Sequence, residues 1–173
     1  MSPQIDFTTH IDLPLVKLPQ AKPCVLVIFG ATGDLTRRKL IPALYSLSRK
    51  GCLPPEFQII GIGRRELSDD DFRDQQRQGV DESAESQHFD ASLWSAFAAQ
   101  ISYLSGDFND RQTLARLAER LAAAPTANRL FYLATAPSAT STIVRELAAV
   151  GLNPEDGGFS RLVIEKPFGH DLA

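Results

Sequence analysis

Three observations predict an α/β domain in which a parallel sheet carries helices on both faces. Apolar runs rich in β-branched residues alternate with helical periodicity, in the order β-α-β-α-β-α-β-α-β. The 173 residues suit one domain, and a 43% hydrophobic, 23% charged composition can bury a core. A glycine-rich turn follows the first apolar run. Together these features favour a single Rossmann-type, doubly wound domain with strand order 3-2-1-4-5.

The chain opens with a strand followed by a long helix. Residues 24–29 form a continuous apolar run that ends at a glycine, which indicates a buried parallel strand. A helix is expected over residues 35–50, with a kink at Pro42 because proline cannot donate a helical hydrogen bond. The inward-facing side chains of this helix are expected to be Leu40, Leu44 and Leu47.

A second strand is predicted at residues 57–63, and Ser68 is a plausible N-cap for the helix that follows. Three aspartates in the first turn of that helix complement its dipole. The polar residues 79–89 are predicted as loop. A short helix is expected at 91–100, and the side chains expected to pack on one side of it are Leu93, Trp94 and Phe97.

The second half repeats the alternation of strands and helices. A third strand and its exit are predicted at residues 101–108, and Asp110 is expected to cap the next helix. A fourth strand at 129–134, a helix at 138–150 and a fifth strand at 161–165 complete the sheet. The apolar stripe of the helix after Asp110 consists of Leu114, Leu117 and Leu121.

The bulk properties narrow the organisation and the partners. Residues 1–23 carry four prolines and are predicted as an extended or disordered arm, so the dinucleotide-binding domain is expected at 24–173. A net charge of −3 offers no attraction for nucleic acid or an anionic membrane, and no apolar run is long enough to span a bilayer. The two cysteines lack metal-site spacing and suit reduced thiols in a cytoplasmic protein without a bound metal.

The turn between the first strand and the first helix is where a Rossmann fold holds pyrophosphate. Glycine lets the backbone approach the phosphates, and the helix N-terminus supplies free N–H groups. The spacing is GxxG, with a threonine where a third glycine would stand, so a purely structural turn is the alternative. The residues expected to bind the dinucleotide here are Gly30, Ala31, Thr32, Gly33, Asp34, Leu35, Thr36 and Arg37.

The end of the second strand bears on the choice of cofactor. NAD-binding units usually carry an acidic residue there, which accepts from the ribose 2′-hydroxyl. This sequence carries Arg64 instead, and an arginine suits a 2′-phosphate, so NADP is favoured over NAD. The alternatives are a solvated surface arginine, pairing with Glu66, or dual use of NAD and NADP.

Several segments resemble the glucose-6-phosphate dehydrogenase family in residues, order and spacing. The first holds the glycine-rich turn in the form FGATGDLTRRKLIPAL, and the last reads IEKPFG. The resemblance implies that the chain is the coenzyme-binding domain of such an oxidoreductase. The segments that carry it are residues 29–44, 60–65, 106–108, 128–134 and 164–169.

The resemblance also implies roles for single residues. Arg64 would contact adenine and the 2′-phosphate, and Asp107 and Phe108 would join the cofactor site, with Phe108 beside adenine. Lys166 would touch both the sugar phosphate and the cofactor, and Pro167 would help to seat the nicotinamide. The chain departs from the family after the fourth strand, because residues 135–140 lack one proline and the aromatic residue usual there.

The resemblance implies that the complete enzyme oxidises glucose 6-phosphate to 6-phosphogluconolactone with NADP, the first step of the oxidative pentose phosphate pathway. The complete enzyme is expected to be a homo-oligomer. The family's catalytic histidine lies in a stretch that this sequence does not contain, and none of His10, His88 and His170 matches it. We therefore expect a fragment without activity of its own. The alternatives are a stand-alone NADP-binding module and an atypical reductase of the GATGxxG type, which would have glycine in place of Thr36.

Overall fold

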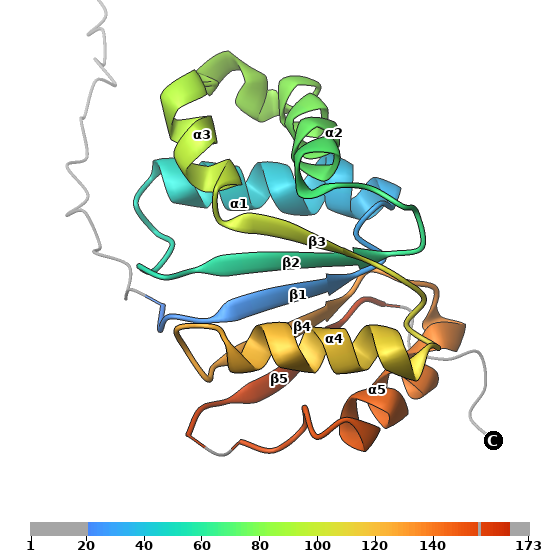
Figure 1. Cartoon of the computed structure of the whole chain (residues 1–173). Coiled ribbons are helices and arrows are strands. Elements are labelled where there is room, and N and C mark those ends of the chain that lie inside the picture. Colours follow the sequence, from blue (N-terminus) through green and yellow to red (C-terminus); the bar gives the residue numbers. More distant parts are fainter. Residues whose placement is uncertain (1–20, 156, 167–173) are drawn as a thin grey trace, which may run out of the picture.

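The five strands form one parallel sheet between two layers of helices (Figure 1). The computed structural model describes residues 21–155 and 157–166, so most of the predicted arm 1–23 lies outside the described residues. The order β3-β2-β1-β4-β5 confirms the prediction. The strands are β1 (Val25–Phe29), β2 (Gln58–Gly63), β3 (Ile101–Ser105), β4 (Arg129–Leu133) and β5 (Ser160–Ile164).

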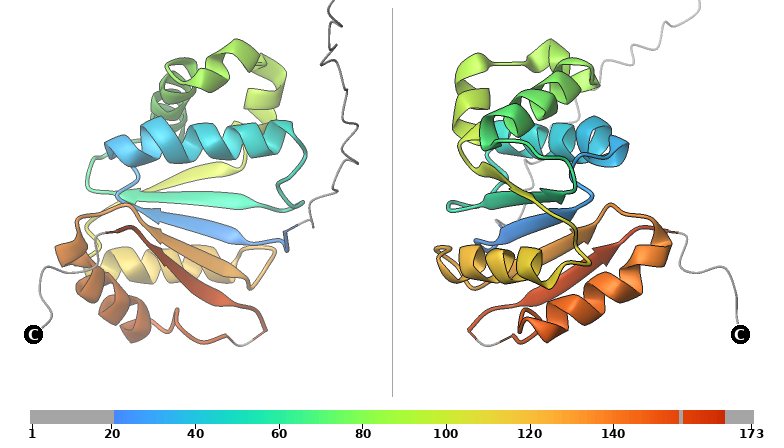
Figure 2. Two further views of the ribbon diagram at one scale, coloured as in Figure 1. Left: turned by 180° about the vertical axis from the view of Figure 1, so that it is seen from behind. Right: turned by 45° about the vertical axis from the view of Figure 1, so that its right-hand side comes forward.

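The helices cover the two faces of the sheet separately (Figures 1 and 2). Helices α1 (Ile41–Arg49), α2 (Asp69–Asp81) and α3 (Ala91–Ala98) lie on one face, and α4 (Arg111–Ala122) and α5 (Thr140–Ala149) on the other. Side chains of β1 alternate between two core clusters, one for each layer of helices. None of the described helices is long and apolar enough to cross a bilayer. The short turns are η1 (Thr36–Leu40), η2 (Ala84–His88) and η3 (Pro137–Ala139).

The predicted inward face of the first helix is confirmed for Leu40 and Leu44, which pack against the core, and is wrong for Leu47. Leu47 is 40% exposed, whereas Ile41 and Tyr45 are fully buried. The buried side of α1 consists of Ile41, Pro42, Tyr45 and Ser46. Before it, η1 is a π-helical turn, which holds one residue more than an α-helical turn. The kink predicted at Pro42 stays a prediction, since the structure places Pro42 in the first turn of α1, just after this π turn.

Two further expectations between β2 and β3 need correction. Residues 79–89 are not all loop, because α2 continues to Asp81 and the 3₁₀ turn η2 follows. Leu93 is 43% exposed, since neighbouring residues on a helix point about 100° apart and Trp94 and Phe97 take the buried side. The predicted cap is confirmed: the Ser68 hydroxyl accepts from the N–H of Asp71 at 3.1 Å.

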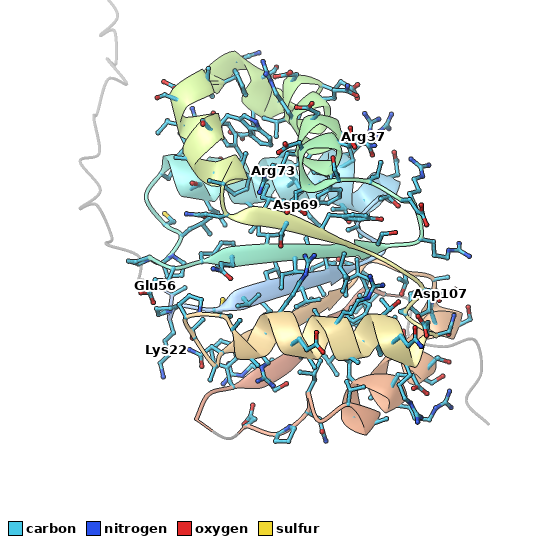
Figure 3. All side chains as sticks on the ribbon, in the orientation of Figure 1. Lys22, Arg37, Glu56, Asp69, Arg73 and Asp107 are labelled. Atoms are coloured by element: carbon cyan, nitrogen blue, oxygen red, sulfur yellow. The ribbon has the colours of Figure 1, made fainter. Side chains whose placement is uncertain are left out.

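Side chains close the outer edge of β3. The Asp69 carboxylate accepts from the Tyr103 N–H at 2.7 Å, and Arg73 Nε donates to the Ile101 carbonyl at 2.9 Å. Both side chains come from α2 and lie over β3 (Figure 3). These bonds hold α2 against the sheet on the side where the candidate site opens. Two arginines of α4, Arg116 and Arg120, donate to further carbonyls of this strand and its end, those of Ser105 and Tyr103.

Candidate dinucleotide-binding site

The glycine-rich turn lies at the carboxyl end of β1, between the exits of β2 and β4. Gly30 has φ +79°, and a Cβ on it would lie 2.5 Å from the Ala134 carbonyl oxygen. The N–H groups of Gly30 and Ala31 both donate to the Ile62 carbonyl, at 3.0 and 2.9 Å. Position 30 therefore requires glycine both for its backbone conformation and for its close approach to β4.

The turn presents unpaired amides at the start of a helix. The first helical hydrogen bond runs from the Arg37 N–H to the Gly33 carbonyl at 3.2 Å. The N–H groups of Thr32, Asp34 and Leu35 donate to no backbone or side-chain acceptor among the described residues. Free N–H groups and the positive end of a helix dipole together form an anion-binding site.

Gly33 differs from Gly30 in what constrains it. Its φ is not positive, and a Cβ on it would meet only the Gly30 carbonyl oxygen, at 3.0 Å. The fold therefore does not require glycine at position 33 as strictly as at position 30. Thr36, in the place of a third glycine, is buried and its hydroxyl lies 3.5 Å from the Gly30 carbonyl oxygen. We infer that Thr36 packs the turn from inside and that Gly33 leaves its outer surface open.

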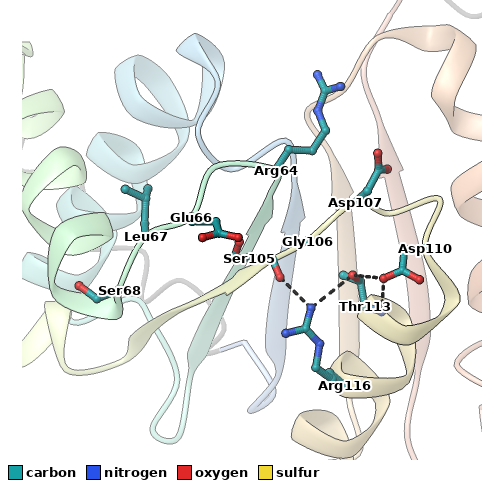
Figure 4. Close-up of a pocket in the computed structure, with 10 residues that line it drawn as sticks. All are labelled: Arg64, Glu66, Leu67, Ser68, Ser105, Gly106, Asp107, Asp110, Thr113 and Arg116. Atoms are coloured by element: carbon teal, nitrogen blue, oxygen red, sulfur yellow. Dashed lines mark hydrogen bonds between the residues drawn. The ribbon is translucent and has the colours of Figure 1, made fainter.

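A pocket of about 520 Å³ opens beside this turn. It is lined by both glycines of the turn, by Thr32, Arg64 and Phe108, and by residues after β4. A second pocket of about 760 Å³ lies between the exits of β2 and β3 (Figure 4). Arg64 lines both pockets. This arginine therefore stands between the anion-binding turn and a second cavity large enough for part of a nucleotide.

The side chain of Arg64 is exposed and forms no ion pair within the described part of the chain. Glu66 lines the second pocket too, but the Arg64 guanidinium extends away from it (Figure 4). The alternative in which Arg64 pairs with Glu66 is therefore not what the structure shows. A guanidinium without a protein partner can bind a phosphate with two parallel hydrogen bonds.

The two aspartates of the second pocket, Asp107 and Asp110, already have hydrogen-bond partners. Asp107 accepts from the backbone and side chain of Asn109, at 2.9 and 2.8 Å. Hydrogen bonds from the Gln112 N–H and the Thr113 hydroxyl hold the pKa of Asp110 below its usual value. The structure separates the predicted pair, because Asp107 lines this pocket and Phe108 the one beside the turn.

The sequence did not single out Arg116, which also lines the second pocket. Its guanidinium donates to the Ser105 carbonyl at 2.8 Å (Figure 4). The sequence signal that could have indicated Arg116 was its position on the second turn of the predicted helix after the third strand. The first turns of that helix, α4, lie beside the exit of β3.

The charged side chains at the start of the first helix form ion pairs within the protein. Arg37 lies 3.1 Å from Glu82, at the end of α2, and Arg38 lies 3.1 Å from Asp34. Neither Arg37 nor Arg38 lines the pocket beside the turn. Of the residues with free amides, Thr32 lines this pocket, together with Gly30 and Gly33.

Comparison with known proteins decides the family. Residues 27–173 match the family model described as "Glucose-6-phosphate dehydrogenase, NAD binding domain". The chain belongs to this family. A glucose-6-phosphate 1-dehydrogenase of Chlamydia muridarum is 40% identical over 164 residues, which are 90% of this chain and 32% of that protein.

Solved structures agree with the family and the fold. The glucose-6-phosphate 1-dehydrogenase of Mycobacterium avium gives a TM-score of 0.75 at 36% identity, covering 87% of this chain and 31% of its own. A glucose-6-phosphate dehydrogenase in complex with its substrate glucose-6-phosphate gives 0.74 at 33% identity, covering 87% of this chain and 32% of its own. The chain thus spans about a third of the length of these members of the family.

Two expectations drawn from the glucose-6-phosphate dehydrogenase family fall at the end of β5. Lys166 is exposed and follows β5, which is separated from β1 by β4. Since neighbouring strands lie about 4.8 Å apart, the exits of β5 and β1 are about 10 Å apart. Lys166 does not line either of the two pockets beside Arg64. Pro167 lies outside the described residues.

The segment where this chain departs from the family pattern lines the pocket beside the turn. The Thr135 hydroxyl is buried there and has no hydrogen-bond partner among the described residues. A buried hydroxyl without a partner is energetically unfavourable. A ligand in the pocket could supply the missing acceptor or donor.

The contact between Tyr132 and Glu165 joins β4 to the residue before Lys166. Burial of Tyr132 and its hydrogen bond to the carboxylate raise the pKa of this phenol to about 12. Because this pKa lies above the ordinary value of about 10 for tyrosine, the neutral phenol stabilises the folded state below about pH 10, and this contribution is lost as the pH rises toward 12.

Glu165→Gln should lower the pKa of Tyr132, as followed by tyrosinate absorbance. Tyr132→Phe must remove that transition, and an unchanged titration in Glu165→Gln would contradict the contact.

Proposed function

We propose that this chain binds NADP with the pyrophosphate at the turn after β1 and the 2′-phosphate at Arg64. The observation that carries the proposal is the set of free amides of Thr32, Asp34 and Leu35 at a helix start. A pyrophosphate supplies the acceptors that these donors lack, and the dipole of the helix favours its negative charge.

The two pockets support the same placement of the cofactor. Arg64 separates the turn from the cavity between β2 and β3, so the adenosine half would lie near Arg64 with Phe108 beside it. The unpartnered Thr135 hydroxyl lies on the other side of Gly30, where the nicotinamide half would extend. Bound NADP would supply the hydride acceptor, and the residues of this chain would hold and orient it.

We further propose that the whole protein is a cytoplasmic glucose-6-phosphate dehydrogenase that works as a homo-oligomer. The substrate would be glucose 6-phosphate, whose C1 hydroxyl must lose a proton while C1 loses a hydride. Lys166 would hold the sugar phosphate from the end of β5, and a general base would accept the proton. We do not assign this role to His88, which is the last residue of η2, between α2 and α3.

Arg64→Ala tests the choice of cofactor. The affinity for NADP should fall by about 1–3 kcal/mol, the range of hydrogen bonds to a charged group, and the affinity for NAD should fall less. Titration calorimetry with both cofactors measures the two losses. Arg65→Ala controls for the loss of one positive charge at the pocket beside the turn, because Arg65 does not line the second pocket, and it should not change the preference for NADP over NAD. Equal losses for NADP and NAD in Arg64→Ala would rule out a 2′-phosphate contact.

A further inference from the structure

Helix α2 touches the start of the first helix at two points. A Cβ on Gly79 would overlap the Arg37 carbonyl oxygen and lie 2.7 Å from Arg37 Cγ. At the end of the same helix, Glu82 pairs with the Arg37 guanidinium at 3.1 Å. Arg37 lies beside α2 in Figure 3. Gly79 of α2 and its C-cap residue Glu82 thus both contact a single residue of η1.

The backbone contact has a specific cause in η1. The Ile41 N–H donates to the Thr36 carbonyl, as a π turn requires, instead of to the Arg37 carbonyl. Pro42 has no N–H and cannot replace that donor. The Arg37 carbonyl is left without its usual helical donor, and the Cα of Gly79 is packed against it. Glycine is unfavourable in the interior of a helix, so this close approach explains why α2 contains a glycine at position 79.

The contact reaches the pyrophosphate turn through one hydrogen bond. Arg37 donates its backbone N–H to the Gly33 carbonyl at 3.2 Å, and this is the first hydrogen bond of the helix. Moving Arg37 would therefore move Gly33 and the free amides beside it. The ion pair itself is partly exposed, with side chains 30% and 56% accessible, and pairs of this kind contribute little to overall stability.

We propose that Gly79 and Glu82 are positioning residues for the pyrophosphate turn, and that they act through Arg37, which is not itself a phosphate ligand. This inference rests on the proposed binding of NADP. In it, α2 holds η1 so that the amides of the turn converge on one anion. The conformation of the turn, and with it the affinity for pyrophosphate, then depends on a helix that does not itself line the pocket beside the turn.

A double-mutant cycle on the ion pair tests the proposal. Glu82→Gln and Arg37→Gln should each weaken NADP binding, by about 3- to 30-fold, the range found for residues that act at a distance. The double variant should be no weaker than either single variant, because both remove the same restraint. The affinity for 2′-AMP, which lacks a pyrophosphate, should stay within about twofold of wild type. Glu85→Gln is the control, since Glu85 forms a similar pair with Arg49 away from the turn.

Gly79→Ala tests the backbone contact separately, with the exposed neighbour in Gln78→Ala as its control. Gly79→Ala should weaken NADP binding at least as much as Glu82→Gln and leave 2′-AMP binding unchanged, while circular dichroism reports whether α2 is intact. If Gly79→Ala does not fold, the ion-pair cycle still decides. Tighter NADP binding in Glu82→Gln with weaker binding in Arg37→Gln would make Arg37 a phosphate ligand and overturn the proposal. Unchanged affinities would also overturn it, whereas a wild-type chain that does not bind NADP would refute the proposed function itself.

Discussion

Gly33→Val is expected to abolish NADP binding while leaving the chain folded. The branched side chain would occupy the outer surface of the turn, where the pyrophosphate must approach the amides. A hydrogen bond to a charged group contributes about 1.5–3 kcal/mol, so losing two lowers affinity by roughly 100-fold or more. The fold should survive because φ at Gly33 is not positive and its Cβ would meet only one oxygen, at 3.0 Å.

Calorimetry gives the affinity and circular dichroism the fold of this variant. Gly30→Ala serves as a contrast, because φ +79° and the approach of 2.5 Å to Ala134 should make it lower the melting temperature. Normal NADP binding by a folded Gly33→Val chain would show that the turn is only structural.

The purified 173-residue chain is expected to give no NADPH from glucose 6-phosphate and NADP. General-base catalysis typically contributes about 10²–10⁴-fold, and this sequence has no match to the family's histidine stretch. Positioning supplies about 7–11 kcal/mol of barrier reduction, and a single exposed lysine, Lys166, cannot hold a sugar phosphate in one pose. The near-ultraviolet absorbance of NADPH follows the reaction.

The control for this assay is Lys166→Ala, prepared in parallel. Residual turnover that is equal in both preparations comes from a contaminating host enzyme. Turnover that the substitution removes would contradict the expectation and would place the catalytic groups within this chain.

The topology was predictable because each strand and helix carries a local signal. Alternating elements and right-handed crossovers leave few arrangements, and the order of the strands follows from the pyrophosphate turn after β1. The caps Ser68 and Asp110 were also readable, since a side-chain oxygen before a helical stripe satisfies the first free amides.

The errors lie where a period of 3.6 does not determine burial. Leu47 fits the apolar period with Leu40 and Leu44 but is exposed, and the π turn of η1 has no signal in that period. Residues 79–89 were predicted as loop because they are polar, and the sequence does not show that Gly79 allows α2 to approach η1.

The residues of the candidate site were predicted in outline, but the ion pairs and hydrogen bonds among them were not. The sequence indicated Gly30, Gly33 and Arg64, and the structure brings all three to one pocket. It could not show that Arg37 pairs with Glu82, which lies 45 residues later in the chain. The Thr135 hydroxyl was missed because being buried without a partner is a property of the packed structure alone.

Titration of the wild-type chain with NADP and with NAD, at one salt concentration, tests the central claim most directly. We predict saturable binding of one NADP per chain, with NAD bound more weakly by the contribution of Arg64. Absence of NADP binding, or NAD bound as tightly as NADP, would contradict the assignment of the turn and of Arg64 to this cofactor.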